Sequence, residues 1–244
     1  MRLRWLGSLD PGHHHRLRLV TDTLERLSTS ERLTLADIGC GDGHLVGAVL
    51  PGPLRGRISY LGIEIDPARL RRARSWVPDR RGGSVWLVAG SADGALPIRS
   101  ETCDAVVCVD VLEHIRDWRR AVREMARLLR PEGVLIVHVP SAVQRRFFRR
   151  FRHWSQQDHV RQGLTQSELS EFMTRAGLHV ESIRLTFGPV MRLLWEVGEL
   201  NTIARRLVRL CLAPFVRLAS MIERTNPPSS GNGILLVGRN RHNI

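Results

Sequence analysis

The sequence contains no lysine. All 37 of its strongly basic side chains are therefore arginine, and against 24 acidic residues they give a net charge of +13. A charge of this sign favours anionic partners, such as phosphorylated molecules, nucleic acid or lipid headgroups. A codon bias toward arginine would spread the same charge over the whole surface, however, so the charge alone does not identify a partner.

Long apolar runs and paired cysteines are also missing. No window reaches the roughly 18 uninterrupted apolar residues of a membrane-spanning helix, and the first residues lack the apolar core of a signal peptide. The cysteines show neither CxxC spacing nor the pattern of a disulfide framework, so we expect them to be reduced and mostly buried. They are Cys40, Cys103, Cys108 and Cys211. These absences predict a cytoplasmic protein, and they leave open an association with a membrane surface.

Short apolar runs alternate with helical patterns over the first 140 residues. The runs lie at 33–38, 58–65, 85–89, 105–109 and 134–139, and the helical patterns at 10–30, 44–50, 66–76 and 117–129. This alternation predicts an α/β fold, a doubly wound sheet of parallel strands with crossover helices on both faces. Ligands bind such sheets beyond the carboxyl ends of the strands, so we expect the chemistry in the loops there.

The most informative of these loops follows the first run, in the segment ADIGCGDG at 36–43. Three glycines stand at alternate positions between a strand and a helix, and Glu64 ends the next strand. A carboxylate placed there can accept hydrogen bonds from the two hydroxyls of a ribose. Asp37 can hold the loop or meet a ligand ammonium. A ligand with a ribose and an ammonium but no phosphate, such as S-adenosylmethionine, fits this pattern better than a dinucleotide does.

With these residues the chain resembles the class I S-adenosylmethionine-dependent methyltransferases, and among them the small-molecule group. The matching stretches are ADIGCGDG, LGIEIDPARLRRAR, SADGALPI, CDAVVCVDVLEHI, LLRPEGVLIVHVPS and DHVRQGLTQSELSEFMTRAGL. The resemblance implies a Rossmann-like seven-stranded sheet, mostly parallel, whose antiparallel last strand pairs with the sixth. We expect those two strands at 178–187 and 233–237, and a helix at 166–176.

The resemblance also implies a donor site. Glu64 would bind the ribose, Ile65 would pack against the adenine, and Asp66 would cap a helix. The adenine amino group would meet Ser91 or Asp93, which the sequence leaves undecided. The full set of expected donor-binding residues is Asp37, Gly39, Cys40, Gly41, Gly43, Glu64, Ile65, Ser91, Ala92, Asp93, Val109, Asp110 and Val111.

Methyl transfer to oxygen or nitrogen can require a general base. His114, just after the fourth strand, and His159 are the two candidates, and a structural role is an alternative for each. Asp110, Glu113 and His114 form a DxxEH cluster that resembles the metal-binding ExxEH of ubiquinone-biosynthesis O-methyltransferases. The same stretch occurs widely in methyltransferases without a metal, so we expect none.

The chain departs from the family between its last two strands, where an apolar, arginine-rich segment covers 188–230. On a helical wheel, Arg205, Arg206 and Arg209 fall opposite Ile203, Leu207, Leu210 and Cys211, and we expect Pro214 to break this helix or to begin the next one. The domains are therefore predicted as a methyltransferase domain at 1–187 with 231–244, and a helical insertion at 188–230. The insertion can be a lid, a contact to a partner subunit, an amphipathic element on an anionic membrane, or a segment that serves packing alone.

A second basic segment, the aromatic cluster at 145–154, follows the fifth strand. Together with the insertion it favours a small-molecule or lipid-linked acceptor, methylated most readily at oxygen. An RNA methyltransferase is the alternative that the charge suggests, but no RNA-binding module is recognisable and the chain has a single tyrosine, so we expect no nucleic acid. A donor-binding partner protein without catalysis is a third alternative, and an oligomer remains open.

Overall fold

The computed structural model describes residues 11–27, 32–50, 53–54, 56–75, 77, 84–151, 159–200 and 205–241. Several positions used in the expectations above lie outside these residues. They are Asp10, residues 28–30, Trp76, residues 152–154, Asp158 and Ile203.

Seven strands form one sheet in the order β3-β2-β1-β4-β5-β7-β6. Their bounds are β1 Leu33–Ile38, β2 Ile58–Glu64, β3 Ser84–Ala89, β4 Cys103–Val109, β5 Leu129–Pro140, β6 Leu178–Thr186 and β7 Gly233–Asn240. The first five strands pair in parallel, and β7 runs antiparallel to both β5 and β6. The predicted doubly wound sheet with an antiparallel last strand is confirmed. The order reverses between β1 and β4, which places the switch point of the sheet there.

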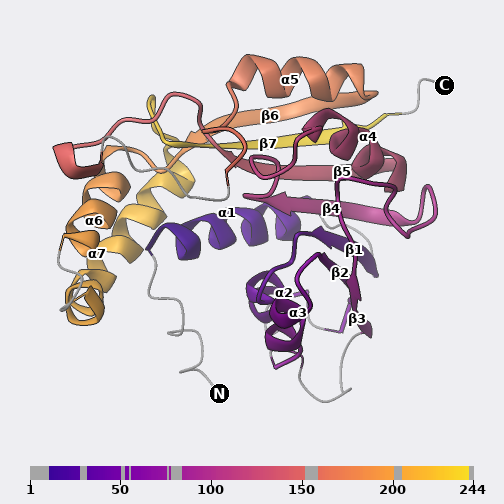
Figure 1. Ribbon diagram of the computed structural model, residues 1–244, viewed down its shortest axis with the longest axis horizontal. Coiled ribbons are helices and arrows are strands. Elements are labelled where there is room, and N and C mark those ends of the chain that lie inside the picture. The colour runs from indigo at the N-terminus through magenta and orange to yellow at the C-terminus, as the bar shows by residue number, and fades with distance from the viewer. Residues whose placement is uncertain are drawn as a thin grey trace.

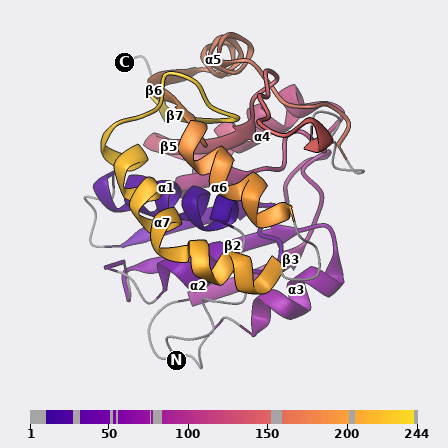
Figure 2. The same cartoon turned by 90° about the vertical axis from the view of Figure 1, so that its left-hand side faces the viewer.

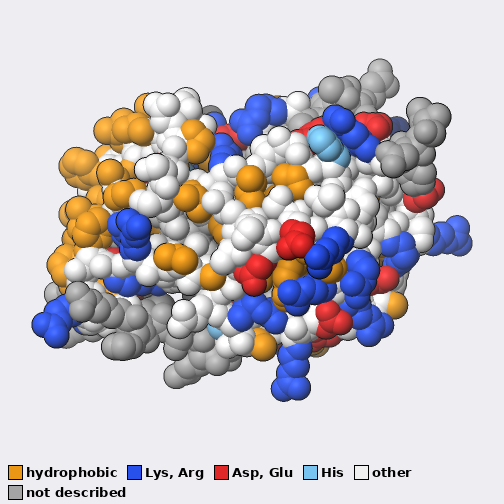
Figure 3. Space-filling view, turned by 90° about the horizontal axis from the view of Figure 1, so that it is seen from above, with side chains coloured by type: hydrophobic (Ala, Val, Ile, Leu, Met, Phe, Trp, Pro, Cys, Tyr) orange, Lys and Arg blue, Asp and Glu red, His pale blue; other side chains and the backbone are white. Residues whose placement is uncertain are grey.

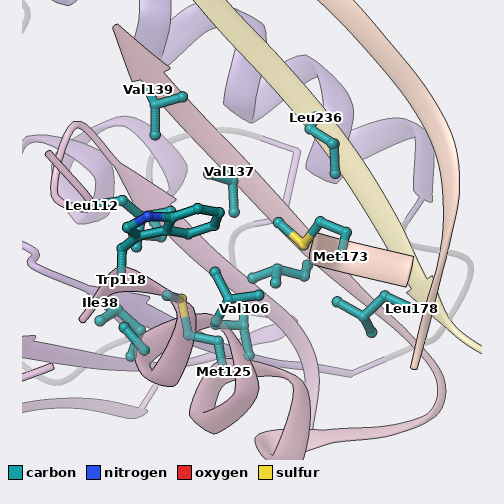
Figure 4. Close-up of a cluster of buried hydrophobic side chains, with 14 of the residues drawn as sticks. Ile38, Val106, Leu112, Trp118, Met125, Val137, Val139, Met173, Leu178 and Leu236 are labelled. Atoms are coloured by element: carbon teal, nitrogen blue, oxygen red, sulfur yellow. The ribbon is translucent and has the colours of Figure 1, made fainter. Parts of the chain in front are cut away.

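Helices cover both faces of this sheet (Figure 1). Their bounds are α1 Pro11–Leu27, α2 His44–Val49, α3 Pro67–Arg74, α4 Trp118–Leu128, α5 Gln166–Arg175, α6 Pro189–Glu199 and α7 Arg205–Thr225. One apolar core lies between the sheet and α1 with α2, and another lies between the sheet and α4 with α5. The α4–α5 core is shown in Figure 4, where Trp118 and Met125 of α4 point toward strand residues such as Val137. The apolar residues of α4 recur every three or four positions, which directs one face of the helix to the sheet.

The insertion forms α6 and α7, which pack side by side at one end of the molecule (Figure 2). The expectation that Pro214 breaks a helix is wrong, because α7 continues through it. Proline removes the N–H that would bond the carbonyl of Leu210, four residues earlier. Both residues lie on the exposed side of α7, so water can satisfy that carbonyl. Cys211 also lies on this exposed side of α7. The other three cysteines are buried.

Buried carboxylates attach the insertion to the rest of the fold. Glu223 of α7 accepts hydrogen bonds from the backbone N–H groups of Phe187 and Gly188, and it lies 2.9 Å from the ring nitrogen Nε2 of His15 in α1. Glu196 of α6 accepts from the backbone N–H groups of Phe147 and Phe148. The apolar contacts between α6 and α7 form only a small cluster, so these polar contacts have a large share in placing the two helices.

Replacing Glu223 with alanine would leave two buried N–H groups without their acceptor. We expect Glu223→Ala to lower the free energy of unfolding by about 2–4 kcal/mol, as measured by urea denaturation. Glu171→Ala on the exposed side of α5 is the matched control and should change it by less than about 0.5 kcal/mol. Equal effects of the two substitutions would show that Glu223 does not anchor α7.

Candidate functional site

A cavity of about 1290 Å³ opens at the carboxyl ends of the strands, beside the switch point. It is larger than most small-molecule sites, so it can hold two ligands at once. The predicted residues that line it are Asp37, Gly39, Cys40, Gly41, Glu64, Ile65, Ser91, Ala92, Asp93, Val109, Asp110, Val111, His114 and His159. Gly43 alone among the predicted site residues is not part of this lining.

The glycine loop turns in a way that other residues would not tolerate. Gly39 has a φ of 75°, and a Cβ there would lie 2.3 Å from Val111 on the loop after β4. Gly43 has a φ of 82° and begins α2, and a Cβ there would lie 2.8 Å from Ala73 of α3. Gly39 therefore keeps the loop close to β4, whereas Gly43 allows α2 and α3 to pack together.

Glu64 fixes this loop from the neighbouring strand. Its Oε2 accepts a hydrogen bond of 2.9 Å from the N–H of Gly41, and its Oε1 accepts one of 3.0 Å from the N–H of Asp66. The carboxylate is buried but reaches the cavity, where each oxygen retains a lone pair for a ligand. Ile65 follows with a side chain that is 68% exposed and presents an apolar surface to the cavity. Asp66 caps α3 as expected, accepting from the N–H of Ala68.

Asp37 lies at the base of the cavity and accepts a hydrogen bond from the hydroxyl of Tyr60. Burial raises the pKa of Asp37 to about 7, and the nearby Glu64 adds to the rise, while the Tyr60 hydrogen bond opposes it. The carboxyl group thus changes charge near neutral pH. A cation bound beside it would favour the ionised form.

Asp110 follows β4 with a φ of 53° and belongs to a network that the sequence did not predict. Its carboxylate pairs with Nε of Arg16 from α1 at 2.7 Å and with Nδ1 of His138 from β5 at 2.6 Å. Nε2 of His138 lies 2.9 Å from the hydroxyl of Thr186. Burial alone would raise the pKa of Asp110, but Arg16 and His138 hold it well below its ordinary value. Asp110 is therefore a fixed anion that joins three elements, not a carboxylate available to take up protons.

A second cluster, formed by Glu113, His114 and His159, lines the same cavity. The two imidazole rings meet edge to face with their centroids 4.6 Å apart, and the ligand-capable atoms of the three residues lie within 4.8 Å of one another. Burial raises the pKa of Glu113 well above its ordinary value, and the charge of Asp110 adds to this effect. Oε2 of Glu113 has no hydrogen-bond partner among the residues that the structure describes.

Arg161 holds the turn that carries this cluster. Its guanidinium donates to the backbone carbonyls of Leu112 and Ile115, at 2.6 Å each, and its own N–H bonds to the carbonyl of Glu113. The segment around His159 is thereby attached to the loop after β4, which is why two histidines distant in the sequence come into contact. The sequence pattern indicated each histidine separately but not their contact or its support by Arg161.

The inner faces of α6 and α7 complete the wall of the cavity with Trp195, Glu199 and Arg209. Arg209 forms an ion pair with Glu199. Arg146, from the basic aromatic segment, stacks over the Trp195 ring at 5.4 Å and donates to Gln144. In the part of the chain that the structure describes, no carboxylate forms an ion pair with Arg146, so this cation is available to an anionic ligand.

Known protein families and solved structures are similar to this chain, and they bear on what the cavity can do. The model of the methyltransferase domain family matches residues 13–183. The chain belongs to this family. A probable S-adenosylmethionine-dependent methyltransferase from Mycolicibacterium smegmatis is 31% identical over 147 residues, which are 59% of this chain and 51% of that protein. The human probable tRNA methyltransferase 9B is 31% identical over 136 residues, 51% of this chain and 24% of that protein.

The fold of the methyltransferase domain is also found in solved structures. A chain from the complex between the Haloferax volcanii Trm112 methyltransferase activator and a putative methyltransferase superposes with a TM-score of 0.63 and 21% identity, covering 98% of this chain and 94% of that one. This likeness confirms the fold. The chain spans only about half, or less, of the length of the curated relatives it matches. The family implies S-adenosylmethionine as the methyl donor.

The pKa of Asp37 makes the stability of the domain depend on pH. A carboxyl whose folded-state pKa lies above its unfolded value stabilises the fold at low pH, and this contribution is lost as the pH rises from about 4 to about 7. Between pH 5 and pH 7 we expect the free energy of unfolding of the wild type to fall by about 2 kcal/mol relative to that of Asp37→Asn. Urea denaturation at several pH values would measure this difference. Parallel profiles would mean that Asp37 ionises normally.

Proposed function

We propose that this protein transfers a methyl group from S-adenosylmethionine to a small-molecule or lipid-linked acceptor, most readily at oxygen. The observation that carries the proposal is the shared cavity. The glycine loop with Glu64, the paired histidines and the arginine-bearing wall of the insertion all line it. Donor, proton acceptor and acceptor-binding surface would thus meet in one enclosed place.

The donor would lie along the loops after β1 to β4. Glu64 would accept the ribose hydroxyls with its two free lone pairs, and Ile65 would cover the adenine. Asp37 would face the ammonium of the methionine part, whose charge would keep this carboxylate ionised. Ser91 accepts a hydrogen bond from the N–H of Asp93, and the exposed carboxylate of Asp93 would accept one from the adenine amino group.

S-adenosylmethionine supplies a methyl group on a sulfonium, which is reactive once a nucleophile is aligned with it. This chain would supply the alignment and the proton transfer. The acceptor hydroxyl would pass its proton to a ring nitrogen of His114 or His159 as the oxygen–methyl bond forms and the sulfur–methyl bond breaks, with S-adenosylhomocysteine as the leaving group. Glu113, kept protonated by burial, would stay neutral beside them and would hold the histidines or the acceptor by hydrogen bonding.

The acceptor would occupy the side of the cavity that Trp195, Arg146 and Arg209 line. The Trp195 ring and the guanidinium of Arg146, which forms no ion pair within the described residues, together suit a molecule with an apolar body and an anionic group. This is the basis for proposing a lipid-linked, phosphorylated acceptor ahead of a neutral metabolite.

A tRNA substrate is the second candidate, and the relatives support it. The human protein reported above is a probable tRNA methyltransferase, and a mouse relative is a tRNA (carboxymethyluridine(34)-5-O)-methyltransferase, 30% identical over 113 residues and 14% of its length.

Incubating the protein with methyl-labelled donor and either a lipid extract or total tRNA would separate the two candidates. Label in the lipid fraction supports the first proposal, and label in tRNA alone replaces it with the second. Donor binding without transfer to either fraction would favour a non-catalytic partner protein.

Calorimetric titration with S-adenosylmethionine and S-adenosylhomocysteine tests the donor site. Both should bind, and NAD should not. Glu64→Ala should weaken the binding by about 1–3 kcal/mol, because the charge-assisted bonds to the ribose are lost. Glu171→Ala should leave it unchanged, and melting curves would confirm that both variants fold. Unchanged affinity in folded Glu64→Ala would remove Glu64 from the ribose role.

The role of the histidines can be tested once one extract fraction accepts the label. Replacement of the histidine that acts as the base, by His114→Gln or by His159→Gln, should lower turnover by about 100-fold or more. The same substitution should abolish the fall in rate at low pH. Affinity for the donor should not change. If both variants keep the wild-type rate, neither histidine is the base. Loss of turnover in a chelator would instead favour a metal ion held by Glu113, His114 and His159.

A further inference from the structure

Among the described residues of α6 and α7, the outer face of the insertion is largely apolar. On α7 the exposed side chains are Leu207, Leu210, Phe215, Leu218, Met221 and Ile222, and together with the exposed Cys211 and Pro214 they form one stripe along the helix. Val190 and Leu193 of α6, and Leu200 directly after it, are also exposed. Leu207 and Phe215 expose 68% and 60% of their surface. Isolated exposed apolar residues are ordinary, but a continuous patch over two adjacent helices marks an interaction surface. From these observations we propose that the outer face of α6 and α7 docks on the surface of an anionic lipid membrane.

The charges of the two helices are arranged by sign. All three acidic residues in their described parts, Glu196, Glu199 and Glu223, are buried and bind partners inside the protein. Arg217 is exposed beside the apolar residues of α7, whereas Arg224 at its end forms an ion pair with Asp22 of α1. Apart from Thr225, the last residue of α7, the exposed side chains of the two helices are therefore apolar or positive. In Figure 3 hydrophobic side chains gather at the end of the molecule where α6 and α7 lie, with arginine among them.

This arrangement fits a lipid surface better than it fits a second copy of the chain. Apolar side chains can enter the boundary between headgroups and acyl chains, while arginine stays with the anionic headgroups. Two copies meeting through this face would bring together chains of net charge +13. Arg217 would find no exposed carboxylate on the described part of the same face to pair with. Self-association would therefore be opposed by the charge that favours the membrane.

The dimensions of the helices also suit this position. The 21 residues of α7 make a helix about 30 Å long, which can lie in the plane of the interface. No helix among the described residues is long and apolar enough to cross a membrane. The inner side of the same two helices contributes Trp195, Glu199 and Arg209 to the cavity. The docked face and the site would thus be opposite sides of one thin wall.

Vesicle flotation tests the docking without any assumption about methyl transfer. The full chain is mixed with vesicles of phosphatidylcholine alone or of phosphatidylcholine with phosphatidylglycerol. We expect binding to the anionic vesicles only, decreasing as sodium chloride is raised. The double substitution Phe215→Gln with Leu218→Gln should weaken it by about tenfold or more, and Arg217→Glu should weaken it at low salt. Trp86→Gln, which changes an exposed apolar side chain on the edge strand β3, is the matched control and should bind as the wild type does.

Each outcome decides the proposal. A cooperative thermal unfolding transition in circular dichroism shows that each variant is folded. If the wild type does not float with anionic vesicles, or floats equally well with neutral ones, the proposal is wrong. It is also wrong if the folded double variant binds as the wild type does. A dimer in light scattering that the double variant abolishes would assign the face to a second copy instead.

Discussion

The site depends on the connection between the ends of β1 and β2. Gly39 and Cys40 donate their N–H groups to the carbonyl of Ile63, and Gly41 donates to the carboxylate of Glu64. The chain can make this turn only because glycine adopts positive φ there. The Glu64 carboxylate thus binds the N–H of Gly41 in the loop and the N–H of Asp66 at the start of α3, and it also faces the cavity. The position of α2, the packing of α3 and the donor side of the cavity all follow from it.

Opposite this turn, the loop after β4 is held by charge. Arg16 from α1 and His138 from β5 meet on Asp110, and Arg161 holds the turn around Glu113. Low dielectric makes such pairs strong and also makes the loss of one partner severe. The cavity therefore has a rigid anion beside the cluster of Glu113, His114 and His159. In the proposed reaction, this separation would allow His114 or His159 to accept a proton from the acceptor while Asp110 stays ionised.

The sequence predicted most of what depends on local pattern. Strands and helices, the glycine loop and the cap at Asp66 were all visible because apolar period, glycine spacing and capping residues act over a few positions. The network of Asp110 was not, since Arg16 lies in an arginine-rich helix where nothing distinguishes it. His138 carried a weak signal, as the one polar residue in the buried strand segment VLIVHV. Pro214 misled the prediction, because whether a helix tolerates proline depends on which side faces water, and that is set by tertiary packing.

The insertion leaves the sheet and returns to it at the same point. Thr186, the last residue of β6, pairs with Gly233, the first residue of β7. Lengthening a loop about tenfold between fixed ends adds only about 2 kcal/mol of closure entropy, and the hairpin below it keeps its register whatever the loop contains. Apart from the anchoring carboxylates Glu196 and Glu223, the wall that would recognise the acceptor is thus a module whose sequence can change with little effect on the strands of the sheet. Divergence in this one connection would give related enzymes new acceptors while their methyl donor stayed the same.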